Sequence, residues 1–246
     1  MRLQTATWPE VEAYLKGSNG IIVPIGSTEQ HGPNGMLGTD SICPETVAFG
    51  VAKSMEVLIA PTISIGQAHH HLGFPGTIAL RPSTLMAVLV DVVRSLYRHG
   101  FRHVYFLNGH GGNEATVKAA FQEIYALSSY GDADLSDLSL KLCNWYMSAG
   151  VGRLSKQLFG DQEGSHATPS EVSLTFYAYP DEVKTASLSP TLAPTGVIHD
   201  ADDYRAQFAD GRIGSNPALA TVEAGERLFK ASVADILEDY RVFLAS

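Results

Sequence analysis

The chain has 246 residues, of which 45% are hydrophobic and 17% charged, and its formal net charge at pH 7 is −9. An acidic balance without any cluster of Lys and Arg excludes the electrostatic footprint of a nucleic-acid-binding protein and disfavours an anionic membrane surface. No apolar run approaches the roughly 20 residues of a membrane-spanning helix, and the N-terminus has no signal-peptide core. The two cysteines, Cys43 and Cys143, lie inside expected regular elements, which argues against a disulfide framework and for a cytoplasmic protein.

Strands and helices are predicted to alternate along a single domain, residues 1–246, because no linker-like segment divides the chain. Thr7 and Glu10 have capping-box spacing, which predicts a helix over 7–16, and the apolar run at 21–25 is typical of a buried parallel strand. Further strands are predicted over 57–65, 103–107 and 138–145, and further helices over 41–55, 83–99 (capped by Ser83), from Asn113 onwards, 168–178 and 218–244. Segment 181–217, rich in Pro, Gly and Asp, has no clear pattern. The alternation predicts an α/β fold, a three-layer α/β/α sandwich with a mostly parallel central sheet.

The loop after the first strand carries three side chains of metal-ligand type. Glu29 and His31 are one residue apart, so in extended backbone both point the same way, and Asp40 follows a Gly-rich stretch. A carboxylate beside an imidazole suits Zn, Mn or Fe, and the two oxygens of an aspartate can bridge two ions. The alternative is that Asp40 is the N-cap of the next helix and that Glu29 and His31 are exposed loop residues.

A further histidine, His110, follows the strand at 103–107 in the segment NGHGGN. Its neighbouring glycines let the backbone approach a ligand closely, which makes Gly111 a candidate substrate contact. The segment lacks the ending of a phosphate-binding loop, and the alternative interpretation is a tight turn with an incidental histidine. Because ligands bind beyond the carboxyl ends of parallel strands, the loops that carry Glu29 and His110 are expected to meet.

A third pair, His166 and Glu171, lies in the segment GSHATPSE. Glu171 occupies the fourth position of a capping box that begins at Thr168, so it is interpreted as a helix cap, a metal ligand or a catalytic base. His166 is a candidate acid or base, or a substrate contact. In the histidine run at 69–71, adjacent residues of a strand would point to opposite faces, so one histidine is expected to face the site, and His70 is the candidate.

Covalent catalysis has little support in this sequence, because there is no serine nucleophile elbow and neither cysteine lies beside a histidine. The ligand-type residues instead favour hydrolysis by a metal-activated water, with two divalent ions (Zn, Mn or Fe) as cofactors.

Four motifs in order, PIGSTEQHGP followed by Asp40, then GFPGT, NGHGGN and SHATPSE, resemble those of the creatininase family of amidohydrolases. The resemblance extends from about residue 22 to 173, and GRIGSNPALAT near 211–221 is similar to a C-terminal stretch of the family. It implies an α/β/α layered fold, a two-metal centre and a ring-like homo-oligomer, often a hexamer built from dimers. Carried over by motif, it implies that Glu29 and His110 hold one metal, that His31 holds the other, and that Asp40 bridges them. It also places His166 over the substrate.

Two departures from the family pattern bear on the substrate. Creatinine-hydrolysing members place a Glu at the position of Gly112, so here Glu171 or water must complete the shell of the second metal. Those members also carry a Trp-Asp pair where this chain reads Asp-Gln-Glu at 161–163, so an aromatic contact is absent. Creatinine is therefore disfavoured, and members with the HGGN version include formamide-cleaving and peptide-trimming enzymes.

Three hypotheses follow. The first is a metal-dependent hydrolase that cleaves a non-standard amide C–N bond, of cyclic amide or formamide type, in a small molecule. The second keeps the site but makes it a peptidase or deformylase, with Trp145 and the loop at 69–74 shaping the pocket. The third is a metal-stabilised binding protein without catalysis, motivated by Gly112. In all three, Gly111, Trp145 and His70 are the candidate ligand contacts.

Overall fold

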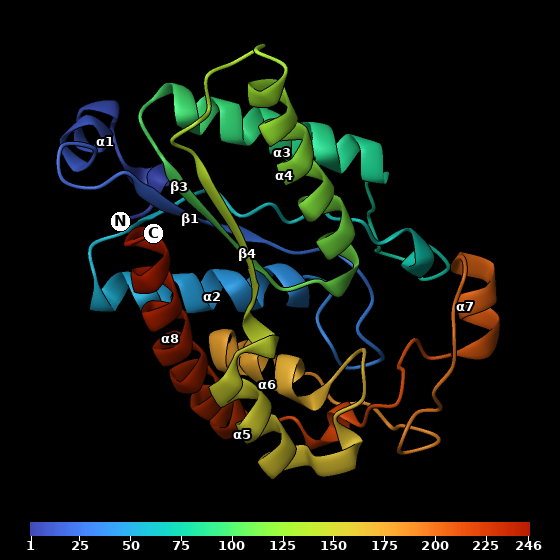
Figure 1. Ribbon diagram of the computed structural model, residues 1–246. Helices are drawn as coiled ribbons and strands as arrows, with labels where there is room; N and C mark the ends of the chain where they lie inside the picture. The colour runs from blue at the N-terminus through green and yellow to red at the C-terminus, as the bar shows by residue number, and fades with distance from the viewer.

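The computed structural model describes residues 1–246, and its centre is a four-stranded parallel sheet in the order β2-β1-β3-β4 (Figure 1). The strands are β1 (Gly20–Ile25), β2 (Leu58–Ile59), β3 (His103–Asn108) and β4 (Ser139–Asn144). β1 and β3 pair along their whole length, from Gly20 opposite His103 to Ile25 opposite Asn108. The carboxyl ends of these two strands therefore lie side by side, which brings together the two loops that follow them.

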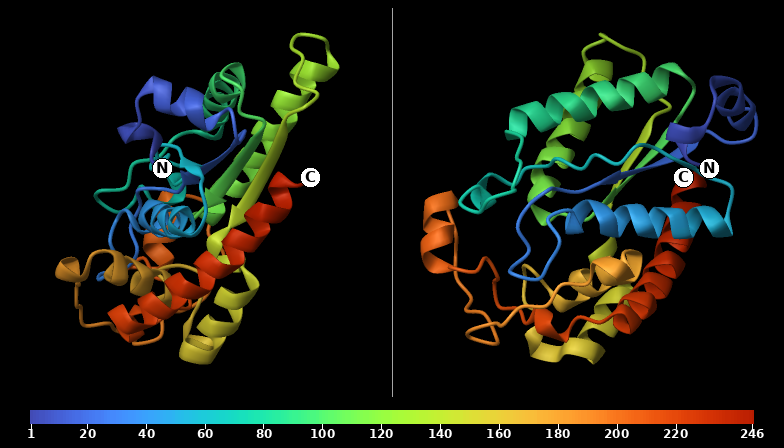
Figure 2. Two further views of the ribbon diagram at one scale, coloured as in Figure 1. Left: turned by 90° about the vertical axis from the view of Figure 1, so that its left-hand side faces the viewer. Right: turned by 180° about the vertical axis from the view of Figure 1, so that it is seen from behind.

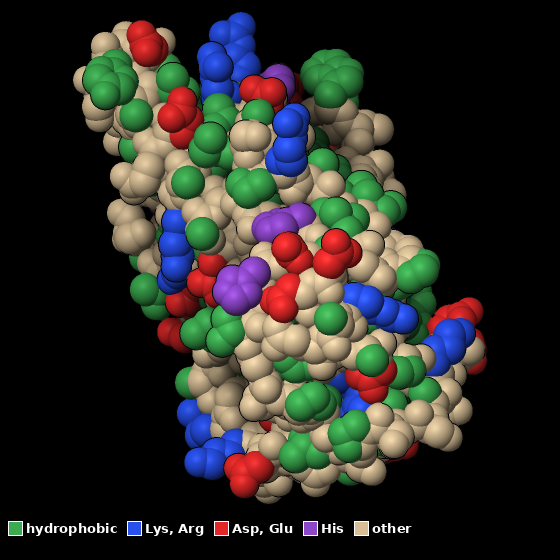
Figure 3. Space-filling model, turned by 90° about the vertical axis from the view of Figure 1, so that its right-hand side faces the viewer, with side chains coloured by type: hydrophobic (Ala, Val, Ile, Leu, Met, Phe, Trp, Pro, Cys, Tyr) green, Lys and Arg blue, Asp and Glu red, His purple; other side chains and the backbone are tan.

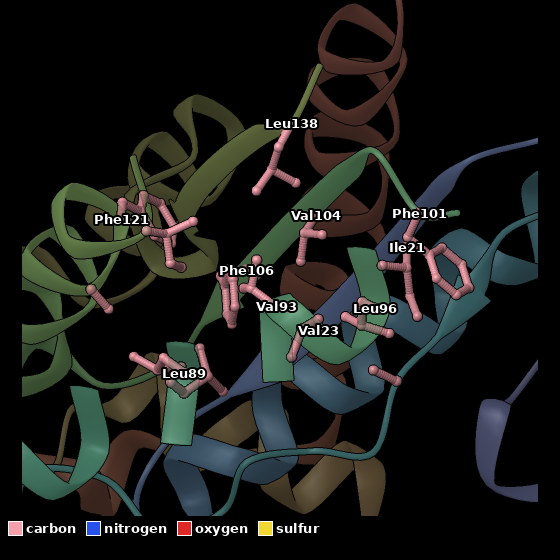
Figure 4. Packing of buried hydrophobic residues seen from close by; sticks show 14 of the residues in the cluster. Ile21, Val23, Leu89, Val93, Leu96, Phe101, Val104, Phe106, Phe121 and Leu138 are labelled. Atoms are coloured by element: carbon pink, nitrogen blue, oxygen red, sulfur yellow. The ribbon is translucent and has the colours of Figure 1, made fainter. Parts of the chain in front are cut away.

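One face of the sheet is covered by α3 (Pro82–Arg98) and α4 (Glu114–Ser129) (Figure 1). The α3 sequence presents apolar residues at helical spacing, and alternate residues of β1 and β3 point toward them. The packed side chains include Ile21, Val23, Val104 and Phe106 of the sheet and Leu89, Val93 and Leu96 of α3 (Figure 4). Each side chain of this size contributes roughly 1.5–3 kcal/mol when it is fully buried, so this layer is a main source of stability.

The opposite face is covered by α2 (Thr39–Ser54), α5 (Ala149–Phe159), α6 (Pro169–Ala178) and α8 (Val222–Leu244) (Figures 1 and 2). α8 packs closely on α6, because Gly225 lies directly against the backbone of Ser173, where a Cβ atom would collide. This contact fixes the first turn of α6, in which Glu171 lies. The three layers confirm the predicted α/β/α sandwich, and its sheet is parallel throughout.

Several element boundaries differ from the predicted ones. β2 ends at Ile59, short of residue 65, because Pro61 has no N–H for the sheet ladder, and pairing with the β1 segment resumes only as an isolated bridge at Ile63. α2 begins before residue 41, so Asp40 lies in its first turn and the N-cap is Gly38. The hypothesis that Asp40 is the N-cap is therefore wrong.

On the face that carries α3 and α4, the predicted cap Ser83 is also wrong. α3 begins at Pro82, with Arg81 as its N-cap, so Ser83 lies within the first turn. α4 begins where it was predicted, with Asn113 as its N-cap residue, but the Asn113 side chain makes no capping hydrogen bond. That side chain instead donates to the carbonyl of Gly26 at 2.9 Å and accepts from the N–H of Gln67 at 2.9 Å. Asn113 therefore ties three loops together at the strand ends.

The sequence patterns also missed two helices, α5 and α7 (Ala201–Gln207). In α5 the apolar residues Val151, Leu154 and Leu158 recur at helical spacing and pack on the core, which is a signal that the sequence contained. α7 spans seven residues within the segment for which no pattern was found, and the side chain of Asp200 caps it. α1 (Trp8–Tyr14) begins with the predicted capping box. No helix has both the length and the apolar character needed to cross a membrane.

Candidate two-metal active site

The predicted site residues converge at the carboxyl ends of β1 and β3. A cavity of about 720 Å³ opens there, and its wall includes Glu29, Asp40, His110, His166 and Glu171. His31 is buried immediately behind this wall, with 1% of its surface exposed. On the side of the molecule that carries α7, histidine and acidic side chains gather near the middle of the face (Figure 3). Ligand-type residues from three separate motifs thus meet at one place, as expected for parallel strands.

Two glycines allow this convergence. Gly26 after β1 and Gly109 after β3 both lie against the backbone carbonyl of Asp40, and a Cβ atom at either position would collide with it. The first turn of α2 is therefore held between the two strand ends. Asn108 supports the second loop, because its side-chain amide donates to the carbonyl of His110 at 2.7 Å.

Asp40 lies between two histidines. Its Oδ1 is 3.0 Å from Nε2 of His31, and its Oδ2 is 3.0 Å from Nδ1 of His110. Glu29 adds a second carboxylate, with Oε2 3.3 Å from the same His110 nitrogen. Each oxygen of Asp40 thus faces a different imidazole, which is the arrangement that a bridging carboxylate requires.

The hydrogen bonding of the carboxylate oxygens bears on whether this centre binds divalent cations. Oε2 of Glu29 and Oδ2 of Asp40 are buried and have no hydrogen-bond partner, although Nδ1 of His110 lies 3.3 Å from the first and 3.0 Å from the second. Buried polar atoms are almost always hydrogen-bonded, so lone pairs that converge without a donor fit a cation. The mixed carboxylate and imidazole set suits Zn, Mn or Fe.

The outer nitrogens of the two histidines support the same assignment. Nδ1 of His31 lies 3.1 Å from the carbonyl of Glu29, and Nε2 of His110 lies 3.0 Å from the carbonyl of Gln67. A carbonyl can only accept, so each outer nitrogen carries the proton and donates it. When these imidazoles are neutral, the inner nitrogens, which face the carboxylates, carry the lone pairs that a metal would use, and metal-binding histidines commonly have such an outer partner.

Glu171 performs its structural role and also faces the centre. Its Oε1 accepts the N–H of Thr168 at 2.6 Å, and the reciprocal bond completes the capping box. Its Oε2 lies 3.9 Å from Nε2 of His31. The cap and the metal-ligand interpretations are therefore compatible. Position 112 cannot supply a carboxylate in place of Glu171, because a Cβ atom at Gly112 would collide with the imidazole of His110.

His166 lies on the other side of Glu29. Its Nε2 is 2.8 Å from the carbonyl of Gln30 and donates to it, so Nδ1 carries the lone pair and lies 3.9 Å from Oε1 of Glu29. Burial, together with the neighbouring His71 and His31, holds the pKa of His166 well below its ordinary value. His166 is therefore a neutral imidazole with an accepting nitrogen that faces the centre.

The pKa values of the centre reflect carboxylates and imidazoles buried together. Burial opposes charge on both His31 and His110, but the carboxylates outweigh it and raise their pKa values to about 10 and about 9. Asp40 is the main carboxylate partner of His31, and Glu29 is that of His110. Burial raises the pKa of Glu171 to about 7, against the opposing effect of His31. Protons thus occupy this centre in the absence of cations.

Metal uptake is therefore expected to release protons. At pH 7 each imidazole must lose its proton before it binds a metal, so each ion bound displaces about one proton and metal affinity rises with pH up to about 9–10. The stability of the metal-free protein depends on pH in the opposite direction. In the folded protein, the pKa values of His31 and His110 both exceed the ordinary 6.5. The contribution of these two groups to stability is therefore complete below pH 6.5 and is lost as pH rises through 9–10. Calorimetric titration of the metal in buffers of different ionisation enthalpy measures the release, and affinity independent of pH would contradict it.

The histidine run at 69–71 is a short 3-10 helix, so the assumption of strand alternation was wrong. Both His70 and His71 line the cavity, and Nε2 of His71 is 3.1 Å from Oε1 of Glu29. Glu29, His71 and His166 form a second cluster with the spacing of metal ligands. However, the side-chain amide of Gln30 lies 2.9 Å from Nδ1 of His71 and donates to it. Nε2 of His71 therefore carries the proton and has no lone pair for a metal.

The predicted contact Trp145 does not line the cavity. β4 ends at Asn144, and Trp145 turns into the core beneath α2 and α8, with 1% of its surface exposed. The next residue, Tyr146, lines the cavity in its place, close to Gly111, which does line the wall as predicted. The error arose because the strand was predicted to extend one residue too far.

Gln30 and Tyr204 are site residues that the sequence patterns missed. The Gln30 amide joins His71 to the carbonyl of Gly211, 2.9 Å away, and to the hydroxyl of Tyr204, 3.1 Å away. Its position between Glu29 and His31 was the available signal, because alternation points it to the opposite side of the loop. Tyr204 lies in α7, within the segment for which no pattern was found.

The fold and the site together define the class of this protein: an α/β/α enzyme whose strand ends carry a buried carboxylate–imidazole centre. The family model for creatininase, creatinine amidohydrolase, matches residues 4–240, so the chain belongs to the creatininase family, whose members are hydrolases acting on amide bonds. This membership favours the enzyme hypotheses over a binding protein without catalysis.

Two relatives with different substrates are similar over most of the chain. The mycofactocin precursor peptide peptidase of Mycolicibacterium smegmatis is 31% identical over 87% of this chain and 81% of its own length. The creatinine amidohydrolase of Pseudomonas putida is 26% identical over 96% of this chain and 94% of its own. The family therefore includes enzymes for a peptide and for a small cyclic amide.

Solved structures of creatininase share the fold. A manganese form is 25% identical with a TM-score of 0.83, and the alignment covers 98% of this chain and 97% of that chain. A mutant in a zinc–zinc form is 25% identical with a TM-score of 0.83, covering 98% and 96%. These structures show creatininases with manganese or zinc.

Proposed function

We propose that this protein is a metal-dependent amidohydrolase that cleaves a non-standard amide C–N bond, of cyclic amide or formamide type, in a small molecule. The observation that carries the proposal is the convergence of the buried Glu29 and Asp40 carboxylates on the inner nitrogens of His31 and His110. The manganese and zinc forms of creatininase support two divalent ions as cofactors.

The proposed ligands divide into two sets that share Asp40. Glu29, His110 and Asp40 would hold one ion, and His31 and Asp40 would hold the other. Glu171 completes the second set through Oε2, in place of the carboxylate that Gly112 lacks. When bound, two divalent ions lower the pKa of a water toward neutrality and polarise the substrate carbonyl.

Two side chains are available for proton transfer. His166 presents a neutral imidazole nitrogen to the centre, and the bond from its other nitrogen to the Gln30 carbonyl fixes the ring. Glu171 lies on the cavity wall, and in the metal-free protein burial raises its pKa to about 7. We propose that one of these two groups delivers the proton to the leaving nitrogen. Gly111 and His70 line the cavity at the place where the substrate would bind.

Replacing His166 with Ala tests its role as a proton-transfer group. We expect the two ions to remain, because Nδ1 of His166 is 3.9 Å from Glu29 and belongs to neither proposed ligand set. The turnover number should fall by about 10²- to 10⁴-fold, as is typical when a general acid or base is removed. Metal analysis and kinetics on the same preparation measure both effects. Loss of an ion would instead identify His166 as a metal ligand.

A second candidate function is a peptidase or deformylase acting on a short peptide or a formylated compound. The cavity volume of about 720 Å³ favours it, because pockets of roughly 300–1,000 Å³ enclose drug-sized ligands and creatinine is much smaller. The 31% identical peptidase relative also supports it. The test is a panel of cyclic amides, formamides and short peptides, assayed with protein loaded separately with Zn, Mn and Fe. Hydrolysis of cyclic amides or formamides alone supports the first function, cleavage of peptides supports the second, and no hydrolysis with any metal contradicts both.

A further inference from the structure

We propose that the substrate of this site carries an anionic group, such as a carboxylate, which the ammonium group of Lys156 binds in the part of the cavity formed by α5. This inference rests on the proposed function, because it assigns a substrate class to the same cavity. It is carried by the composition of the cavity wall, by the open face of α5 and by the charges that surround Lys156.

Lys156 is the only Lys or Arg among the residues that line the cavity. Its ammonium group forms no ion pair and no hydrogen bond with another residue, although it shares the cavity wall with Asp161 and Glu163. Oε1 of Glu163 accepts from the hydroxyl of Ser170, and its Oε2 is buried without a hydrogen-bond partner. The ammonium group of Lys156 is therefore available to a ligand.

The face of α5 that carries Lys156 is open. Gly152, Ser155 and Lys156 are spaced by three and four residues, so they share one face of the helix, and all three line the cavity. A Cβ atom at Gly152 or Gly160 would meet nothing within 4 Å. The hydroxyl of Ser155, the residue before Lys156, has no hydrogen-bond partner in the protein. This face thus offers space, a hydroxyl donor and a cation.

The charges of the cavity define what this space accepts. In the proposed metal centre, the ions neutralise Glu29, Asp40 and Glu171, so these carboxylates do not repel a substrate anion. Asp161 and Glu163 remain on the wall and disfavour an anion elsewhere, so Lys156 is the position at which one is accepted. Basic side chains on the exposed face around α7 are scattered singly and form no competing patch (Figure 3). A substrate that spans from the metal centre to α5 and ends in a carboxylate fits this pattern.

Binding of matched probes tests the proposal without requiring turnover. The probes are α,ω-diacids from malonate to suberate, and for each chain length the corresponding half-amide, in which one carboxylate is neutral. With metal-loaded protein, one carboxylate can occupy the metal centre while the other reaches Lys156. We expect one chain length to bind about tenfold to a hundredfold more tightly as the diacid than as the half-amide, as for a hydrogen bond to a charged group. Calorimetry on the full-length protein measures this ratio.

Three variants show whether Lys156 is responsible. Lys156→Gln should abolish the preference for the diacid while leaving the half-amide affinity unchanged. Lys156→Glu should transfer the preference to the ω-amino acid of the same length. Lys230→Gln, which makes the same charge change at an ion pair on the surface of α8, is the control and should have no effect. An unchanged diacid preference in Lys156→Gln, or no preference in the wild type, would overturn the proposal.

The ratio of diacid to half-amide affinity, measured on metal-free protein, distinguishes a failure of the anion site at Lys156 from a failure of the proposed function. Loss of the ions lowers affinity for diacid and half-amide alike, whereas loss of the Lys156 contact removes only the difference between them. A protein that binds no metal but still prefers the diacid through Lys156 would contradict the proposed function and support the anion site.

Discussion

Replacing Asp40 with Asn is expected to abolish the metal centre and with it the activity. The substitution preserves shape but removes the charge that faces His31 and His110, each 3.0 Å from one of the Asp40 oxygens. Mutation of groups that merely orient metal ligands costs about 10- to 100-fold, so loss of a shared ligand should cost at least about a hundredfold in kcat/KM. Bound metal, measured by elemental analysis, should fall from about two ions per chain to less than one.

The matched control for this variant is Asp137→Asn, at an exposed aspartate that binds Arg102 far from the cavity. It should retain both the ions and the activity. Circular dichroism should show that both variants are folded, so that a loss of metal reports on the site. Two tightly bound ions and activity within tenfold of the wild type in Asp40→Asn would show that Asp40 bridges nothing.

Replacing Glu171 with Gln separates its two roles. Gln keeps an oxygen that accepts the Thr168 N–H, so the capping box survives and the free energy of unfolding should change by less than about 1 kcal/mol. The charge of Oε2 near His31 is lost, and so is a group whose pKa lies at about 7. We expect kcat/KM to fall by about 10²-fold or more and the affinity for the second ion to weaken.

The chain provides its own control for this experiment. Glu10 occupies the same position in the capping box of α1, where its carboxylate accepts from Thr7 at the surface. Glu10→Gln should leave activity and metal content unchanged. If Glu171→Gln behaves like Glu10→Gln, Glu171 is only a helix cap, and the second ion has no third protein ligand.

The architecture was predictable because its signals are local. The apolar run of β1, the helical spacing of α3 and the capping boxes of α1 and α6 each specify an element without reference to the rest of the chain. α5 carried such a signal too, and overlooking it also hid the cavity face that bears Lys156. The short β2 and the start of α2 depend on pairing and close backbone contacts, which a sequence pattern does not describe.

The site residues also fall into a group that local sequence signals predict and a group that depends on contacts distant in sequence. Glu29, Asp40 and His110 were predictable as neighbours because parallel strands bring their following loops to one edge of the sheet. The role of Gln30 depends on Tyr204 and Gly211, more than 170 residues away in sequence, and on the orientation of its amide. Tyr146 lines the cavity wall where Trp145 was predicted, because β4 ends one residue earlier than predicted. Element boundaries are the least reliable part of such predictions.

The central claim is that two divalent ions, bridged by Asp40, are required for amide hydrolysis. The most direct measurement is a titration of metal-free protein with Zn or Mn, in which bound metal and the rate of hydrolysis are recorded on the same samples. We predict binding of two ions per chain, with full activity only after the second has bound. Full activity in protein that holds less than about one tenth of an ion per chain would contradict the account.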